Sequence, residues 1–132
     1  AGRPRQSTWK ATNMNSFEET RHRLREFCAA RDWDQFHSPK NLAMALSVEA
    51  AELLEHFQWL TEAQSAALPA DKLAAVAQEI ADVQIFLVRL ADKLGIDLDA
   101  AVAAKLVVNE QKYPADKARG NALKYTEFDD GE

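Results

Sequence analysis

The chain has 132 residues, of which 47% are hydrophobic and 28% are charged, a length and balance that predict one folded soluble domain and exclude a disordered protein. Acidic residues outnumber basic ones 21 to 16 and the net charge is −5, so no overall positive field exists for a nucleic acid polymer or an anionic membrane. Cys28 is the single cysteine, and no apolar run approaches the ~20 residues that span a bilayer. We expect a cytoplasmic protein without disulfides.

The first two helices are predicted from their capping residues. Ser16 followed by Glu19 has the spacing of a capping box and predicts a helix over residues 16–31. Ser38 directly precedes a proline, a pair typical of an N-cap and the first helical position. This pair predicts a second helix that ends near Trp59.

The remaining sequence predicts two further helices. A short helical turn is expected within residues 61–68, and a long helix over residues 70–94 should end at Gly95 in a left-handed cap. Asp97 can cap a fourth helix that stops near Pro114. Apolar residues recur along the long helix at alternating steps of three and four, which is the spacing of one bundle seam. They are Leu73, Val76, Ile80, Val83, Leu87, Leu90 and Leu94.

These elements predict an all-α fold in which residues 16–114 form a four-helix bundle protomer. Residues 1–15 are polar and predict a disordered N-terminal arm. Residues 115–132 lack periodicity and predict an irregular tail that can pack on a neighbouring subunit. The wide apolar faces of so small a protomer predict assembly into a homo-oligomer.

Two pairs of acids interrupt the apolar pattern. Glu49 and Glu52 lie three residues apart on the second predicted helix, and Glu79 and Asp82 repeat that spacing on the long helix, so each pair projects from one helix face. Such pairs are also common on solvated faces, but Glu49 continues the apolar stripe of its helix. If the pairs converge, like charges ~4 Å apart repel by about 4 kcal/mol at an effective dielectric near 20. A positive charge must then compensate.

A divalent metal ion is the simplest source of that charge. From Asn41 to Asp71 the sequence contains no lysine or arginine. Carboxylate oxygens without histidine or thiolate ligands suit Mg²⁺, with Mn²⁺ as the alternative, and Mg²⁺ leaves positions open for water and phosphates. The acids therefore predict a metal site that serves phosphoryl chemistry.

The order of these acids resembles that of a known family. Glu49-Ala-Ala-Glu52, then 26 intervening residues, then Glu79-Ile-Ala-Asp82 resembles the ExxE…ExxD pattern of the MazG-like, all-α nucleoside triphosphate pyrophosphohydrolases. The stretches RDWDQFHSPKNLAMAL, HFQW, NEQKYP and RGNALKYTE look like the dCTP pyrophosphatase branch of that family. The resemblance covers residues 16–128.

The resemblance implies a chemistry. Glu49, Glu52, Glu79 and Asp82 would bind Mg²⁺, and the enzyme would cleave the α–β phosphate bond of a (d)NTP, above all dCTP or a modified dCTP, to give a nucleoside monophosphate and pyrophosphate. The metal would orient the triphosphate and acidify a water that attacks phosphorus. Glu55, one turn beyond Glu52, is expected to help position or deprotonate this water. The implied role is removal of unwanted nucleotides from the pool.

The resemblance also implies a pocket for the base. Trp33 and Trp59 would supply flat apolar surfaces around it, and His37 would donate to the substrate or cap the loop that it ends. Two positions depart from the branch, which has histidine where this chain has Leu24 and tyrosine where it has Phe86. Because hydrogen bonds discriminate between bases far better than apolar fit does, these departures should weaken cytosine selectivity.

Residues nearer the C-terminus match the family as well. Lys105 and Asn109 lie one turn apart on the fourth predicted helix and would reach phosphate or sugar. Arg119, Lys124 and Tyr125 in the tail would complete a site, across a subunit boundary if the tail packs on a neighbour. The family implies a homotetramer, a dimer of dimers, with a homodimer as the alternative.

Two other functions fit parts of the pattern. A ferritin-like di-iron bundle also projects acids inward but needs Glu-x-x-His on two helices, whereas His56 follows Glu52 by four residues and is expected only to flank the site. The second alternative is a non-catalytic, oligomeric nucleotide-binding or regulatory module that binds metal and ligand without turnover.

Overall fold

This computed structural model describes residues 17–128, in which every regular element is a helix. No strand occurs within that range, which confirms the predicted all-α class. None of its helices is both long and apolar enough to cross a membrane. In chain order the segments are α1 (Phe17–Ala30), η2 (Asp34–Phe36), α2 (Pro39–Glu55), α3 (Glu62–Ser65), α4 (Ala70–Lys93), α5 (Leu98–Lys112), α6 (Ala115–Ala118) and η3 (Tyr125–Glu127).

The chain divides into two compact units at the boundary between Ile96 and Asp97. The first unit contains α1 to α4, and the second contains α5, α6 and η3. The single domain over residues 16–114 therefore stays a prediction. The expected arm, residues 1–15, and the expected cap Ser16 lie outside the described residues.

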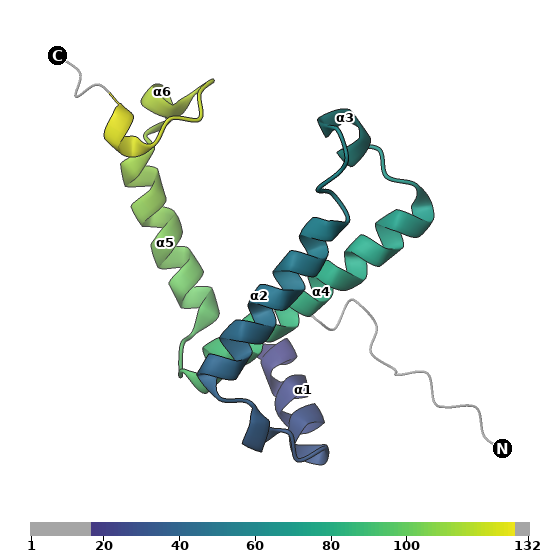
Figure 1. Cartoon of the computed structure of the whole chain (residues 1–132). Coiled ribbons are helices and arrows are strands. Elements are labelled where there is room, and N and C mark those ends of the chain that lie inside the picture. The colour runs from purple at the N-terminus through teal and green to yellow at the C-terminus, as the bar shows by residue number, and fades with distance from the viewer. Residues whose placement is uncertain (1–16, 129–132) are drawn as a thin grey trace. The chain divides into compact units, whose positions relative to one another are not determined.

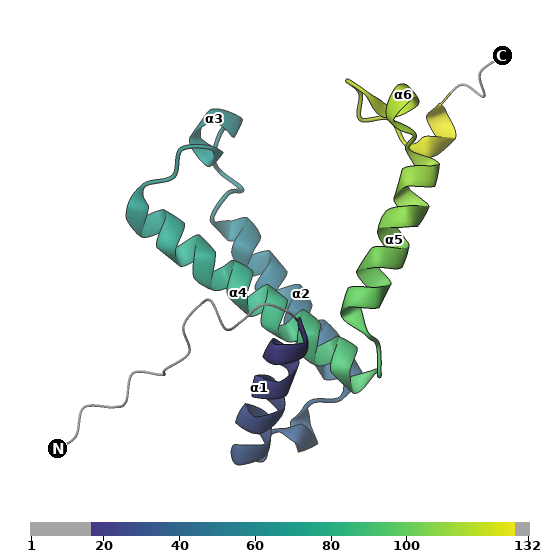
Figure 2. The ribbon, with the colours of Figure 1, turned by 180° about the vertical axis from the view of Figure 1, so that it is seen from behind.

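Within the first unit, α2 and α4 lie side by side and run in opposite directions, with α3 at the tip between them (Figure 1). Helix α1 packs across α4, as the view from behind also shows (Figure 2). Leu42 on α2 and Val76 on α4 are buried in this core, and so is Cys28 on α1. The hairpin therefore places α2 and α4 face to face along the stretches that carry the acids.

Local capping explains where these helices begin and end. The Ser38 side chain accepts a hydrogen bond from the Asn41 backbone N–H at 3.1 Å, which confirms the predicted start of α2. Gly95, with a φ of 68°, confirms the predicted left-handed end of α4. The predicted end of α2 near Trp59 is wrong. The helix ends at Glu55 because the next N–H groups turn to carbonyls three residues back, as His56 does to Leu53 at 3.2 Å.

The predicted seam of α4 is only partly a core of this unit. Val76 is buried, but Leu73 and Ile80 are 57% and 54% exposed. The residues that pack near the C-terminal end of α4 are instead Val88 and Ala91, together with a buried arginine, Arg89. Part of the apolar stripe therefore faces away from the core of the first unit.

The second unit is organised around α5. The Asp97 side chain accepts the Ala100 N–H at 3.1 Å and α5 ends at Lys112, so both predicted limits of this helix are confirmed. The stretch after Pro114 was expected to be irregular but contains α6 and η3. Aromatic packing holds this segment, since the Tyr113 ring contacts Tyr125 and Phe128 at centroid distances of 6.2 and 5.7 Å.

Candidate active site

Three acids converge from the two facing helices of the hairpin. Glu49 on α2 and Glu79 and Asp82 on α4 each offer a carboxylate oxygen, and these three oxygens lie within 4.8 Å of one another. The two acids of α4 share a face because they lie three residues apart. Glu49 reaches them because it continues the inward stripe of α2 that begins at the buried Leu42. The predicted convergence of acids is therefore present in the fold.

Glu52 lies next to Glu49 and completes the set of four acids. Burial, then a hydrogen bond and charge repulsion from Glu52, then repulsion from Asp82 and Glu79 together raise the pKa of Glu49 to about 7. The negative charges of the neighbouring acids favour the neutral form of this carboxyl group. Glu55, one turn further, is exposed and does not join the group.

The donor atoms of this group fit a hard divalent cation. The Oε2 atoms of Glu49 and Glu79 are buried and have no hydrogen-bond partner among the described residues. Buried carboxylate oxygens are costly unless something positive contacts them. Three or four carboxylates at this spacing, all from oxygen donors, match the ligand preference of Mg²⁺ or Mn²⁺. His56 Nε2 lies 3.8 Å from Glu79 Oε1, so His56 flanks the acids as expected.

A cavity of about 420 Å³ between α1 and α4 shares Asp82 with the acid group. Leu24 and Phe86, the two positions that depart from the branch pattern, both line it. Its remaining walls are mainly apolar. The lining residues are Thr20, Arg23, Leu24, Phe27, Asp82, Ile85 and Phe86. An apolar cavity beside a carboxylate group suits a ligand with a flat base and an anionic tail that a divalent cation links to the carboxylates, which alone would repel the tail.

Trp33 is connected to this cavity by its contact with Phe27. The Trp33 and Phe27 rings pack edge to face at 5.6 Å with an interplanar angle of 74°, and Phe27 lines the cavity. His37 also contacts Trp33, at a centroid distance of 6.4 Å, but its Nδ1 atom is engaged by Arg89 and lies near Cys28. Trp59, by contrast, is 87% exposed and lies beyond the end of α2.

The remaining predicted site residues belong to the second unit. Lys105, Arg119, Lys124 and Tyr125 are exposed there and Asn109 is half-buried. The Lys112 ammonium lies 4.8 Å from the centre of the Tyr125 ring. The expected contacts of these residues with substrate stay predictions.

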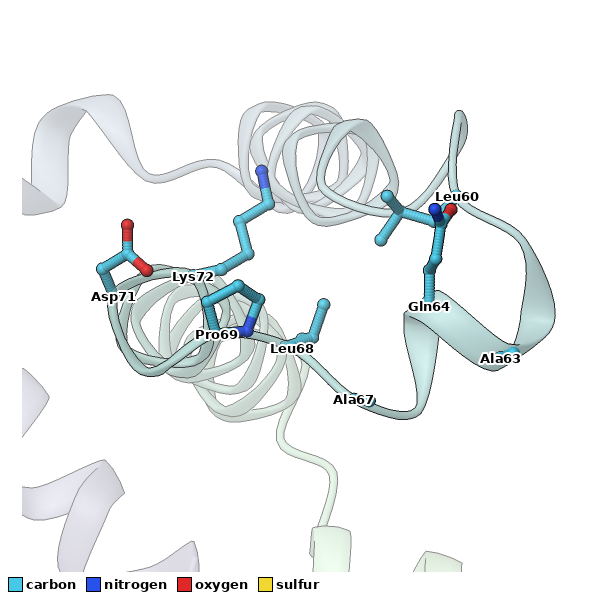
Figure 3. A pocket seen from close by; sticks show the side chains of 8 residues that line it. All are labelled: Leu60, Ala63, Gln64, Ala67, Leu68, Pro69, Asp71 and Lys72. Atoms are coloured by element: carbon cyan, nitrogen blue, oxygen red, sulfur yellow. The ribbon is translucent and has the colours of Figure 1, made fainter.

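A second hollow, of about 640 Å³, lies at the tip of the hairpin. Figure 3 shows the Leu60, Leu68 and Lys72 side chains around it, with Asp71 directed away. It is lined by Leu60, Ala63, Gln64, Ala67, Leu68, Pro69, Asp71 and Lys72, and none of the four clustered acids is among them. This hollow is separate from the candidate active site.

Sequence reasoning missed part of the cavity wall and its support. Thr20, Arg23 and Ile85 line the cavity without having been singled out. Arg89, which is 4% exposed, was missed although it interrupts the apolar run from Ile85 to Ala91. A charge within such a run is a detectable signal, because a buried arginine requires partners.

Comparison with known proteins agrees with this geometry. The model of the MazG-like family matches residues 44–128. The chain is 45% identical over 118 residues to mouse dCTP pyrophosphatase 1 and 43% identical over 119 residues to the human protein of that name. Each alignment covers 88% of this chain and 69% of the relative.

A solved structure is similar as well. The crystal structure of a pyrophosphatase from Archaeoglobus fulgidus superposes with a TM-score of 0.70 at 44% identity, covering 74% of this chain and 91% of that one. Its likeness lies in both sequence and fold. The family match covers both acid-bearing helices from Met44 onward, including all four clustered acids. The chain belongs to the MazG-like family.

Proposed function

We propose that this protein hydrolyses dCTP, or a modified dCTP, between the α and β phosphates and releases a nucleoside monophosphate and pyrophosphate. The observation that carries the proposal is the convergence of Glu49, Glu79 and Asp82 beside an apolar cavity that shares Asp82. The acids, through a bound cation, would take the triphosphate, and the adjoining apolar cavity would take the base. The proposed role is removal of surplus or altered nucleotides from the cytoplasmic pool.

The class of reaction follows from the relatives. The matched mammalian proteins are dCTP pyrophosphatases, and the similar solved structure is a pyrophosphatase. This chain is accordingly a nucleoside triphosphate pyrophosphohydrolase. The preference for cytosine is the proposed part, because the cavity presents Leu24 and Phe86 where the branch pattern has two polar side chains.

We propose that Glu49, Glu52, Glu79 and Asp82 hold Mg²⁺, with Mn²⁺ as the alternative. The ion would neutralise phosphate charge and acidify a water molecule. The two unpartnered buried oxygens of Glu49 and Glu79 support this assignment. The neighbouring acids that raise the pKa of Glu49 support it as well, because a cation among them would favour the charged carboxylate.

The other residues would bind and orient the substrate. Phe86, Leu24 and the Phe27–Trp33 pair would enclose the base and exclude water from it. Glu55 would help position or deprotonate the attacking water from the turn after Glu52.

Groups outside the cavity would complete the site. His37 would hold the loop that carries Trp33, and Trp59 would contact the base with its exposed ring. Phosphate and sugar contacts are proposed for the residues of the second unit that match the family. They are Lys105, Asn109, Arg119, Lys124 and Tyr125.

Assembly is proposed to complete the site. The outward apolar residues Leu73 and Ile80 on α4, and Leu106 on α5, support a homotetramer or a homodimer. A neighbouring copy would then cover these faces and bring its own residues to each site. A non-catalytic nucleotide-binding module is the competing function. It would have the same geometry and would differ in that it does not turn over its ligand. The di-iron alternative gains nothing from the structure, where His56 contacts only one of the acids as a flank.

The test is release of pyrophosphate from each common dNTP and NTP in the presence of Mg²⁺. Glu49→Gln and Asp82→Asn should lower turnover by at least about 100-fold, because each removes a charge from the proposed metal site. Glu62→Gln, an exposed acid on α3, is the matched control and should leave turnover unchanged. Absence of metal-dependent turnover on every triphosphate would contradict the enzyme, and equal rates on all bases would contradict the dCTP preference.

A further inference from the structure

A buried charge network ties η2 to the C-terminal half of α4. The Arg89 Nη2 group donates to Asp34 Oδ1 of η2, and its Nε–H donates to His37 Nδ1 at 3.3 Å. Lys93, one turn further on α4, donates to the same Asp34 oxygen at 3.3 Å. Because arginine stays charged in proteins, a guanidinium buried to this degree is stable only when such partners surround it.

The same guanidinium connects to α1. Arg89 Nη1 lies 3.8 Å from Asp92 Oδ2, and Asp92 accepts two hydrogen bonds from Arg25 of α1, at 2.8 and 2.5 Å. Cys28 Sγ of α1 lies 3.7 Å from the His37 Nδ1 atom that Arg89 also contacts. Arg89 is therefore the side chain at which α1, η2 and α4 meet.

The segment held in this way forms the outer support of the cavity wall. Trp33 directly precedes η2, and its N–H donates to the Cys28 carbonyl at 3.0 Å. Its ring packs on Phe27, which lines the cavity, while the Arg31 guanidinium covers the Phe27 ring at 3.6 Å. The Phe27 ring is thus flanked by Arg31 and by Trp33, and Trp33 leads directly into η2.

We propose that Arg89 is a positioning residue for base recognition, which fixes the Phe27–Trp33 wall of the cavity through its bonds to Asp34 and His37. This inference rests on the proposed function. Arg89 contacts none of the four clustered acids, so its effect falls on substrate binding and base choice rather than on the chemical step. Removing it leaves His37 without its α4 partner and Asp34 with Lys93 as its partner on that helix, which loosens the wall.

The chemistry of His37 follows from the same contacts. An arginine N–H pointing at Nδ1 requires that nitrogen to accept, so the neutral ring carries its proton on Nε2. Burial, and then the Arg89 charge, lower the pKa of His37, in keeping with a neutral ring. The tautomer gives a signature of the network that does not depend on catalysis.

Steady-state kinetics on dCTP and on dTTP, with Mg²⁺, test the proposal. Arg89→Gln should raise KM for dCTP by about tenfold and lower the ratio of kcat/KM for dCTP over dTTP, with kcat changed less than about twofold. Arg89→Lys should recover little of this loss, since one ammonium cannot bridge Asp34 and His37 as the planar fork does. Asp34→Asn, at a half-exposed position, provides the same test if Arg89 variants do not fold.

Arg25→Gln is the matched control. It breaks a comparable ion pair between α1 and α4 but leaves the contacts of η2 intact, and its KM and base ratio should stay at the wild-type values. In ¹⁵N-labelled protein, the His37 ring should show a protonated Nε2 in the wild type and in Arg25→Gln, and a mixture of tautomers in Arg89→Gln.

The outcomes separate this inference from the proposed function. A wild-type protein without turnover overturns the function, and the tautomer measurement still judges the network. Turnover with an unchanged KM and base ratio in both Arg89→Gln and Asp34→Asn overturns the positioning role. A uniform loss of kcat on both substrates, or an equal effect in Arg25→Gln, overturns it as well.

Discussion

Glu49 on α2 and Glu79 on α4 face each other with a buried Oε2 atom apiece, and neither atom has a hydrogen-bond partner among the described residues. Both belong to the group whose carboxylate oxygens lie within 4.8 Å. Burial without partners costs free energy for each of them. The stability of the unit should therefore depend on what neutralises this pair, whether a proton or a cation.

The metal-free protein should lose stability as the pH rises through the titration of Glu49. The pKa of this carboxyl is about 7 in the folded chain against 4.5 ordinarily. Between these values the folded state binds more protons than the unfolded state, so the free energy of unfolding falls as the pH rises from about 4.5 to about 7. Glu49→Gln removes this titration. Urea unfolding across this range measures the free energy of unfolding of both proteins. The difference curve, variant minus wild type, should rise with pH.

Other groups change stability with the opposite sign, which is why the difference curve is needed. The Lys93 hydrogen bond lowers the pKa of Asp34, and the Arg25 hydrogen bond lowers that of Asp92. Their contributions are present at neutral pH and are lost as the pH falls through the folded pKa values. A difference curve that is flat, or that favours the wild type as the pH rises, would contradict the raised pKa of Glu49.

Mg²⁺ should offset the loss of stability that the ionisation of Glu49 causes at high pH. Binding needs ionised carboxylates, so the ion should stabilise the protein more at pH about 8 than at about 5. At a free concentration about 100 times the Kd, the expected gain is about 2.7 kcal/mol. Thermal unfolding with and without Mg²⁺, in the wild type, Glu79→Gln and the control Glu62→Gln, measures it. Equal stabilisation of Glu79→Gln and Glu62→Gln would place the ion elsewhere.

Local signals made much of the fold predictable. Ser38, Gly95 and Asp97 act through hydrogen bonds or backbone angles within a few residues, so their patterns were sufficient. The end of α2 was missed because no glycine or proline marks Glu55. The seam of α4 was predicted by its period, but period alone does not say which part a single chain buries, and Leu73 and Ile80 face outward.

The acid group was predictable because it leaves a pattern in the sequence. The cavity wall leaves no such pattern. Glu49 stands in an apolar stripe and repeats the spacing of the α4 pair, which signals a shared site. Thr20 and Arg23 line the cavity only because α1 crosses α4, a tertiary arrangement without a local pattern. The Arg89 network likewise requires η2 to fold back on α4, although the charge in an apolar run marked the position.

Base selectivity should respond to polar groups restored in the cavity. Leu24 and Phe86 line it, and the double variant Leu24→His with Phe86→Tyr adds hydrogen-bonding atoms at both positions. Because hydrogen-bond readout discriminates strongly, the ratio of kcat/KM for dCTP over dTTP should rise by about tenfold or more. The apolar control Leu24→Met with Phe86→Leu should produce no such rise. An unchanged ratio in the polar variant would show that the base does not contact these positions.

Self-association should depend on the exposed apolar residues of α5. Leu106 is 56% exposed, and burying a leucine contributes about 1.5–3 kcal/mol. Because a two-fold interface repeats each change, Leu106→Glu should lower the association constant by at least about 100-fold if Leu106 lies in the contact.

Sedimentation velocity over a concentration series measures this change, with Gln111→Glu on the exposed surface of the same helix as the control for added charge. A wild-type protein that stays monomeric throughout would contradict assembly. If Leu106→Glu and Gln111→Glu assemble alike, the interface must use the outward residues of α4, and Leu73→Glu then becomes the variant that should dissociate it.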